Sequence, residues 1–339
     1  MMTALATEVG GRAARGTAGS EDEAGDSLEY EYAVQMQRIL GADVMRVFDR
    51  HGTSELYANP DGSVWSVAQG RGHSPAGLTL RAPEIEAFLN VAAARLGETI
   101  TPQHPHLQGE LPHPVFGGAR LQGVVPPITG GPMFRVRKRP SEVIPLERYL
   151  ADGVMTREQY DAIRWGISQD YGIVVAGPTS SGKTYLLNSL LREQARAMVS
   201  PTDPVFVLED TVEALSEAPN TVSLRTTPEC DFDILLFIAL RCTPKYLHVP
   251  ECRRFASQML EMWSTGHPGF CTVHASSAEG ALERLGRLAR RDTGRNEGWL
   301  VASAVQLVVV INPTPTGRRV TEVAQCTGYR KGRYLLTSL

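Results

Sequence analysis

Eight consecutive residues have the types and the spacing of a phosphate-binding loop. They read Gly177-Pro178-Thr179-Ser180-Ser181-Gly182-Lys183-Thr184 and satisfy the pattern G-x-x-x-x-G-K-[ST] in full. In such a loop the glycines let the backbone curl so that its N–H groups converge on phosphate oxygens. The lysine places a positive charge on the β- and γ-phosphates, and the threonine hydroxyl ligates Mg²⁺. Residues 177–184 therefore predict a site for ATP, with Mg²⁺ on Thr184; the alternative is a glycine-rich turn that binds no ligand.

The loop lies in the local context that the motif requires. Residues 173–176, Ile-Val-Val-Ala, have the pattern of a short buried strand, and residues 184–197 have that of a helix. A helix that starts at the loop aims its N-terminal N–H groups at the phosphates. Hydrolysis is a separate prediction, because it needs further groups that orient or activate the attacking water.

Carboxylates follow two other apolar segments. Residues 205–208 are followed by Glu209 and Asp210, and residues 246–249 are followed by Pro250 and then Glu251. Ligands bind at the carboxyl ends of parallel strands. Glu209 and Glu251 are therefore candidates for the group that handles water. For either acid the alternative is a helix N-cap or a solvated strand end.

Histidines flank a third apolar segment. Residues 270–273 end at His274, and His267 lies in the loop before them. A single histidine is more often structural than catalytic. The position of His274 at a ligand-facing strand end makes it a candidate site residue.

The elements that carry these residues indicate an α/β domain over residues 146–339. Short apolar strands that alternate with helices are typical of a parallel sheet covered on both faces. Helices are expected at 146–151, 157–169 and 184–197, and strands at 173–176, 205–208, 246–249 and 270–273.

The preceding part of the chain has a different pattern. Residues 1–26 are small, polar and charged, which predicts a disordered tail. Residues 27–138 predict a smaller α+β domain, and residues 139–145 predict a linker. The helices of the α+β domain are expected at 28–40 and 82–96, and its strands at 44–48, 55–58, 64–67, 121–125 and 133–136.

Composition limits the function classes. The 339 residues carry a formal net charge of -3, so no global basic field favours nucleic acid or an anionic membrane. Five scattered cysteines without C-x-x-C spacing argue against a disulfide framework or a zinc site and favour a reducing cytosol. We find neither a signal peptide nor an apolar run of the roughly 18 residues that a membrane span needs. A cytoplasmic location is expected, with any membrane contact made through partners.

Taken together, these motifs resemble the TrbB-type ATPases of conjugative transfer, within the wider family of type II and type IV secretion ATPases. The acidic "Asp box" of that family is matched by residues 208–213, and its relaxed Walker B segment by Pro250-Glu251-Cys252-Arg253. Its "His box" is matched by residues 263–277. The first domain of the family is matched by residues 59–65 and 120–138.

The resemblance implies a fold and roles for single residues. The fold is a RecA-like P-loop domain preceded by a smaller α+β domain. Glu251 positions or activates water, Glu209 helps arrange Mg²⁺ and water, and His274 senses the γ-phosphate. Arg120 and Arg137 reach the phosphates from the N-terminal domain and neutralise transition-state charge. The alternative for the two arginines is an exposed or salt-bridged pair.

The resemblance also implies a function: a hexameric cytoplasmic ATPase that powers a conjugation-type type IV secretion apparatus through its inner-membrane components. Three alternatives remain open. One is a type IV pilus or type II secretion motor, and another is a nucleotide-binding scaffold with little turnover. The third is a DNA-translocating motor, against which the acidic chain argues. A stripe formed by Arg284, Arg287, Arg290 and Arg291 keeps that third alternative open, although a solvated helix face or a subunit contact explains the stripe better.

The sequence departs from the family pattern near the proposed site. Lys245 stands where the family has an acid before the Walker B strand, and Pro250 replaces the glycine before Glu251. Pro178 and Ser180 occupy loop positions where glycines are common. None of these changes removes a candidate catalytic side chain, although Pro250 lacks a backbone donor and has a fixed φ.

Overall fold

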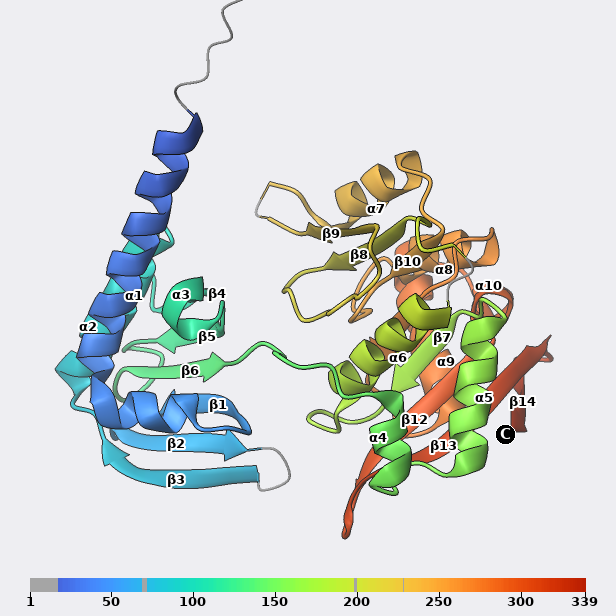
Figure 1. The fold of residues 1–339 in the computed structure, drawn as a ribbon, viewed down its shortest axis with the longest axis horizontal. Coiled ribbons are helices and arrows are strands. Elements are labelled where there is room, and N and C mark those ends of the chain that lie inside the picture. The colour runs from blue at the N-terminus through green and yellow to red at the C-terminus, as the bar shows by residue number, and fades with distance from the viewer. Residues whose placement is uncertain (1–17, 69–71, 198–199, 228) are drawn as a thin grey trace, which may run out of the picture. The chain divides into compact units, whose positions relative to one another are not determined.

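The computed structural model describes residues 18–68, 72–197, 200–227 and 229–339. The chain divides into two compact units, Met1–Arg139 and Pro140–Leu339, which are described separately (Figure 1). The division falls at the start of the segment expected to be a linker. Among the described residues, none of the helices combines the length and apolar character that a membrane crossing requires.

The first unit begins with a longer helix than expected. Helix α1 runs over Ala18–Asp49, with a break at Gly41, where φ is 80°. It starts inside the segment predicted to be a disordered tail, of which residues 1–17 lie outside the described residues. The strand predicted at 44–48 was wrong, because these residues are helical. Val44, Val47 and Phe48 are all buried, and their spacing of three and four places them on one helix face.

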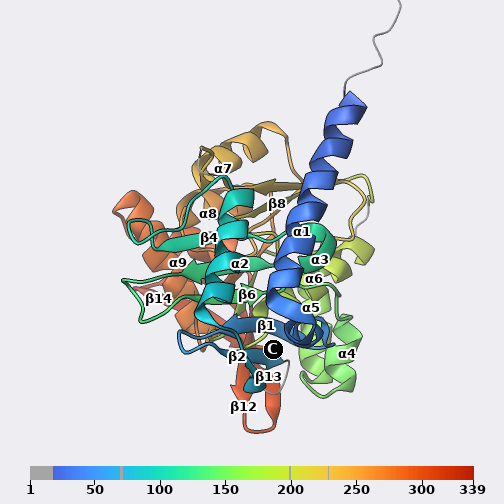
Figure 2. The ribbon, with the colours of Figure 1, turned by 90° about the vertical axis from the view of Figure 1, so that its left-hand side faces the viewer.

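A six-stranded antiparallel sheet completes this unit, in the order β3-β2-β1-β6-β5-β4. Helices α1 and α2 lie on one face of it, and the core between them includes Met36, Phe88 and Phe134 (Figure 2). The remaining elements are β1 (Thr53–Ala58), β2 (Ser63–Ala68), β3 (Gly72–Thr79), α2 (Ala82–Arg95), β4 (His106–Glu110), α3 (His113–Phe116), β5 (Arg120–Val124) and β6 (Met133–Arg137).

The second unit is a mixed α/β fold. Strands β10, β8 and β9 form one parallel sheet, and the other sheet has the order β11-β7-β12-β13-β14. Its elements are α4 (Leu146–Ala151), α5 (Arg157–Ser168), β7 (Ile173–Ala176), α6 (Lys183–Ala197), β8 (Val205–Glu209), β9 (Thr221–Arg225), α7 (Phe232–Arg241), β10 (Tyr246–His248), α8 (Ala256–Ser264), β11 (Phe270–Val273), α9 (Ala278–Thr293), α10 (Gly298–Ala304), β12 (Leu307–Thr314), β13 (Gly317–Arg330) and β14 (Arg333–Ser338).

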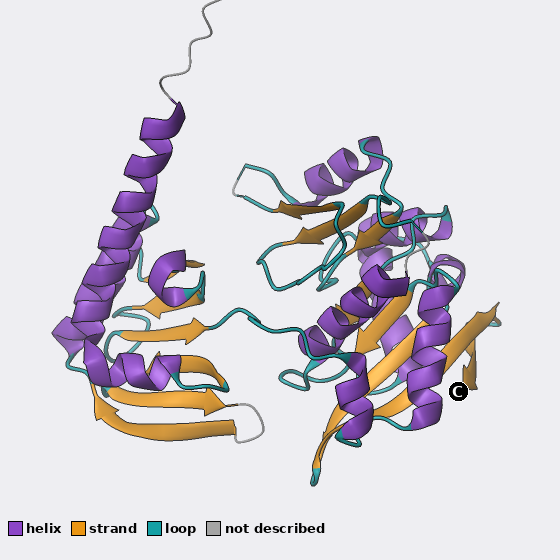
Figure 3. Cartoon of the chain, viewed as in Figure 1, coloured by secondary structure: helices purple, strands orange, loops and turns teal. Residues whose placement is uncertain are grey.

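Strand β7 lies inside its sheet and is apolar at every position, because both of its faces are buried. In β7, Val174 and Ala176 join the core formed with α8 and α9, whereas Ile173 and Val175 join the core formed with α5 and α6. The sheet is therefore covered on both faces, as expected for a parallel sheet (Figure 3). Strands β13 and β14, which pair antiparallel to their neighbours, were not predicted from the sequence.

The two sheets of this unit meet between β10 and β11. Val249 donates its N–H to the carbonyl of Phe270 at 3.0 Å, and Thr272 donates to that of Pro250 at 3.2 Å. The buried imidazole of His248 accepts the N–H of Phe270 at Nδ1, at 3.0 Å. The junction brings the carboxyl ends of β7, β8, β10 and β11 to one edge, where the predicted site residues of this unit lie.

Candidate active site

The phosphate-binding loop joins β7 to α6, as its motif predicts. A Cβ on Gly177 would lie 2.3 Å from the carbonyl oxygen of Ile311 and 2.4 Å from Ser181 Oγ, so only glycine fits there. Gly182 has φ of 98°, which other residues rarely adopt. The buried Ser181 Oγ has no hydrogen-bond partner among the described residues. A tight loop that contains an unsatisfied hydroxyl fits a phosphate-bearing ligand.

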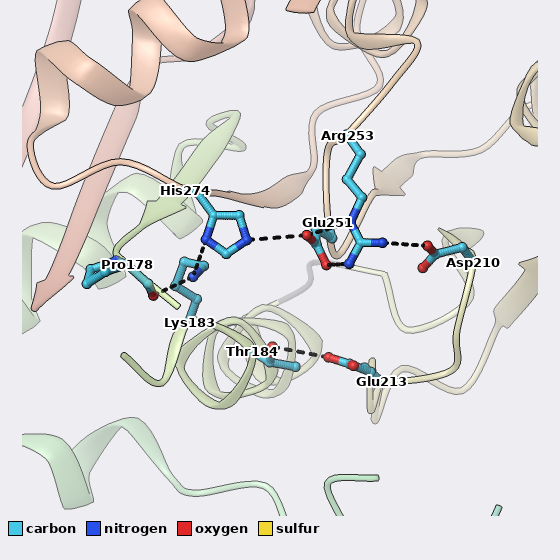
Figure 4. Close-up of polar contacts among 8 residues, drawn as sticks. All are labelled: Pro178, Lys183, Thr184, Asp210, Glu213, Glu251, Arg253 and His274. Atoms are coloured by element: carbon cyan, nitrogen blue, oxygen red, sulfur yellow. Dashed lines mark hydrogen bonds and ion pairs between the residues drawn. The ribbon is translucent and has the colours of Figure 1, made fainter. Parts of the chain in front are cut away.

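Lys183 belongs to a chain of polar contacts that runs along the edge of the sheet (Figure 4). It is only 8% exposed, and its Nζ donates to the carbonyl of Pro178 at 2.8 Å. The same Nζ lies 3.3 Å from His274 Nδ1, and His274 Nε2 lies 3.5 Å from Glu251 Oε1. The fold therefore brings together three side chains predicted from separate motifs.

The contacts define the state of His274. A lysine ammonium can only donate, so Nδ1 is the acceptor and the proton resides on Nε2, facing the Glu251 carboxylate. Burial and the charge of Lys183 lower the pKa of His274, and the opposing influence of Glu251 does not reverse this. The imidazole is therefore neutral at pH 7 and presents an N–H toward Glu251.

Glu251 is held ionised by Arg253. Burial raises the pKa of the Glu251 carboxyl, but two hydrogen bonds from Arg253, of 2.6 and 2.7 Å, and the nearby positive charge outweigh it. The net effect is a lowered pKa. Arg253 also contacts Asp210 at 3.2 Å, which ties the Walker B segment to the acidic loop after β8. Glu251 is therefore an oriented anion at neutral pH.

Glu209, the last residue of β8, and Glu213, in the loop that follows it, differ in what they contact. Glu209 is 3% exposed, and its Oε2 accepts the backbone N–H groups of Glu213 and Ala214 at 2.9 and 3.1 Å. Glu213 instead faces the P-loop, and Thr184 Oγ1 donates to its Oε2 at 3.3 Å. In the sequence, Glu213 stands out only as part of the acidic motif at residues 208–213. Its place in the acidic run four residues after Glu209 was the available signal.

Thr184 and Glu213 have the chemistry of a magnesium site. Mg²⁺ prefers oxygen ligands and is commonly held by one or two protein groups together with substrate phosphates. A hydroxyl and a carboxylate 3.3 Å apart at the start of α6 suit that coordination. Among the residues that the structure describes, no cluster of three or more His, Cys, Asp or Glu side chains could hold a metal by itself.

The sequence departures at Lys245 and Pro250 have different places. Lys245 precedes β10, at the end opposite to Glu251, and its Nζ pairs with Asp170 at 2.9 Å. Just after β10, Val249 donates its N–H to Phe270 of β11, and Pro250 takes part through its carbonyl, which accepts the N–H of Thr272. The contacts between β10 and β11 therefore do not need an N–H at residue 250.

Arg120 and Arg137 lie in the first unit. They stand directly opposite each other on the paired strands β5 and β6. The P-loop belongs to the second unit, so neither unit by itself contains both the arginines and the loop. Their proposed reach toward the phosphates stays a prediction.

Comparisons with known proteins agree with these motifs. The sequence profile of the T2SSE family, described as "Type II/IV secretion system protein", matches residues 101–327. The chain is 37% identical over 302 residues to "Conjugal transfer protein TrbB" of Rhizobium radiobacter, covering 88% of this chain and 92% of that protein. It is 35% identical over 306 residues to "Probable conjugal transfer protein TrbB" of Sinorhizobium fredii, covering 90% and 92%.

Solved structures support the fold. The ATPase DotB of Legionella pneumophila is similar with a TM-score of 0.56 at 20% identity, covering 91% of this chain and 81% of that one. DotB of Yersinia pseudotuberculosis has a TM-score of 0.58 at 21% identity, covering 81% and 76%. The family match spans more than half of the chain. The chain therefore belongs to the type II/IV secretion system protein family, with TrbB conjugal transfer proteins as close relatives.

Proposed function

We propose that this member of the type II/IV secretion family is the ATPase motor of a conjugation-type type IV secretion apparatus. The observation that carries the proposal is the convergence of Lys183, His274 and Glu251 beside a complete P-loop. The relation to TrbB proteins over about 90% of the chain supports the biological context. In this proposal the second unit is a RecA-like domain, and the first is its N-terminal companion.

Nucleotide binding follows from the loop and Lys183. The N–H groups of residues 177–184 and the start of α6 hold the phosphates, and Lys183 exchanges the Pro178 carbonyl for phosphate oxygens. Mg²⁺, when present on Thr184 and Glu213, supplies positive charge that stabilises the transferred phosphoryl group. Glu209 keeps the loop that carries Glu213 in place, through its two backbone contacts.

Glu251 is the group that orients water in this proposal. Its lowered pKa keeps it ionised, so it accepts a hydrogen bond from the attacking water and aims it at the γ-phosphate. Arg253 restrains its rotation through two hydrogen bonds. The neutral His274, in contact with both Lys183 and Glu251, responds to a γ-phosphate that competes for Lys183.

The assembled state adds charge from the first unit. We assign Arg120 and Arg137 to transition-state neutralisation, with motion of the first unit about residues 138–145. Homohexamers on the cytoplasmic face of the inner membrane, in contact with apparatus components, complete the proposal. Mass measurement with and without Mg-ATP tests the oligomer: a mass that remains monomeric in both conditions contradicts the hexamer.

Steady-state phosphate release tests the enzyme. Wild type should turn over ATP, whereas Lys183→Ala and Glu251→Gln should not. Lys245→Ala is the matched control, because Lys245 pairs with Asp170 away from the loop. Wild-type turnover no faster than the two site variants would contradict the motor and, with ATP binding retained, would favour the low-turnover scaffold. Plasmid transfer by cells that carry each variant separates conjugation from a pilus or type II secretion role.

A further inference from the structure

The hairpin between β12 and β13 returns the chain to the P-loop. Arg318, the second residue of β13, donates from Nη2 to the carbonyl oxygen of Ser180 at 3.1 Å. Its aliphatic part packs over Gly182, where an added Cβ would lie 3.4 Å from Arg318 Cδ. Thus one side chain, distant in sequence by 138 residues, touches two residues of the phosphate loop.

Ser180 is the conformationally unusual member of that loop. Its φ is 61°, in the left-handed region that glycine adopts freely and other residues adopt at a cost. This is a position where the sequence has serine although glycines are common in such loops. A strained backbone persists only where its surroundings hold it. The hydrogen bond from Arg318 to the Ser180 carbonyl is a contact that can hold Ser180 in this conformation.

The charge of Arg318 has not been neutralised by an acid. Among residues 18–68, 72–197, 200–227 and 229–339, Arg318 forms no ion pair within 4.0 Å, so its positive charge remains at the phosphate loop. A guanidinium that donates to a neutral carbonyl keeps its full charge and other N–H donors. The same group can therefore both fix the loop and attract an anionic ligand.

We infer that Arg318 is a positioning residue that holds the P-loop in its phosphate-binding shape and compensates for the serine at position 180. It acts through Ser180 and Gly182 rather than on the reacting atoms. The ligand is the phosphate chain of ATP, so this inference rests on the proposed function for the identity of the nucleotide. The loop geometry itself can be tested without nucleotide.

Arg319 is a built-in control. It is the next residue on β13, and strand alternation places it on the opposite side. Its Nη1 lies near Gly153, 3.1 Å from where a Cβ would stand, rather than at the P-loop. Arg318 and Arg319 are thus two arginines of the same hairpin, of which Arg318 contacts the P-loop and Arg319 lies near Gly153.

Nucleotide affinity of the full chain is the first measurement, with a fluorescent ATP analogue and Mg²⁺. Arg318→Ala should weaken binding about tenfold and raise KM similarly, as for a lost hydrogen bond from a charged donor, with kcat changed less than about threefold. Arg318→Lys should recover part of the affinity, and Arg319→Ala should bind like wild type. Equal affinities for Arg318→Ala and wild type overturn the inference.

Hydrogen exchange of the nucleotide-free chain is the second measurement. Amides of residues 179–183 should exchange faster in Arg318→Ala than in Arg319→Ala, with the helices of the second unit unchanged. Unchanged loop exchange contradicts the positioning role, even if affinity falls. Should wild type bind no nucleotide, the proposed function fails, while this comparison still decides the role of Arg318.

The serine supplies a third test. In a Ser180→Gly background the left-handed conformation no longer needs support. Arg318→Ala should then weaken binding less than about threefold, against about tenfold in wild type. Equal losses in the two backgrounds mean that Arg318 does not compensate for Ser180.

Discussion

The two ends of strand β10 carry similar residue types with different consequences. At the amino end, Lys245 just before the strand and the hydroxyl of Tyr246, its first residue, both contact Asp170, at 2.9 and 2.8 Å. After it, Glu251 contacts Arg253 and His274, and His274 leads on to Lys183. The first cluster is a closed set of partners near the surface. The second joins the ends of β10 and β11 to Lys183 of α6, at the P-loop.

The contrast indicates at which end of a parallel strand a substitution alters the candidate site. An unexpected residue at the amino end of a parallel strand finds a local partner and leaves the ligand-facing edge unchanged. An unexpected residue at the carboxyl end lies among the groups that we propose bind phosphate and orient water. On this view the Lys245 departure is structural, and the chemistry depends on the contacts around Glu251.

Removing the lysine of each cluster gives the largest contrast. Lys183→Ala should lower kcat/KM for ATP by about 10³-fold, because a preorganised charge at the phosphates is lost. Lys245→Ala should remain within about twofold of wild type. The measurement is steady-state phosphate release. Comparable losses in both variants would show that the two ends are not functionally distinct.

Neutralising the acid at the carboxyl end gives the next effect. Glu251→Gln should lower kcat about 10²-fold, because water loses its anionic acceptor, while binding of an ATP analogue stays close to wild type. Glu261→Gln, an exposed glutamate on α8, is the matched control. A large loss of affinity with unchanged kcat would move Glu251 from water orientation to binding.

His248, the last residue of β10, should contribute to the dependence of stability on acid pH. Burial lowers the pKa of His248 to about 3, against about 6.5 for an unfolded histidine. Between these values the unfolded chain binds the extra proton, so stability falls as pH falls below about 6.5. From pH 7 to 5 this contributes a loss of about 2 kcal/mol.

His248→Asn should abolish that contribution, because the amide can still accept from the N–H of Phe270 but does not titrate. Urea unfolding at pH 7 and 5 measures it. The stability gap between wild type and variant should narrow by about 2 kcal/mol at pH 5. A gap independent of pH contradicts a buried, neutral His248.

The smallest effect on stability and turnover is expected for a substitution at the amino end of β10. Asp170→Asn keeps an acceptor for Tyr246 and tolerates the φ of 52°, but it loses the ion pair with Lys245. Both partners are roughly 40% exposed, so the cost should be below about 1 kcal/mol. Thermal unfolding and phosphate release should both stay near wild type. Loss of turnover in this variant would contradict the prediction, because it would show that the Lys245–Asp170 contact affects the candidate site at the other end of β10.

Local sequence determined much of this protein. The P-loop between β7 and α6 follows from a motif of adjacent residues, and the buried central strands follow from continuous apolar runs. The positions of Glu251 and His274 after β10 and β11 follow as well, because parallel strands place their carboxyl ends at one edge. Residues 44–48 were assigned to a strand, since a short apolar run does not distinguish strand from helix.

Which side chains meet depends on the folded arrangement of strands and loops. Glu213 rather than Glu209 faces Thr184, because the loop after β8 folds around the Glu209 carboxylate. Arg318 reaches Ser180, because β12 runs beside β7 and the hairpin beyond it turns back to the loop. Such contacts depend on strand order and on loop conformation. Neither is encoded in the spacing of neighbouring residues, so these partners emerge only when the whole second unit is folded.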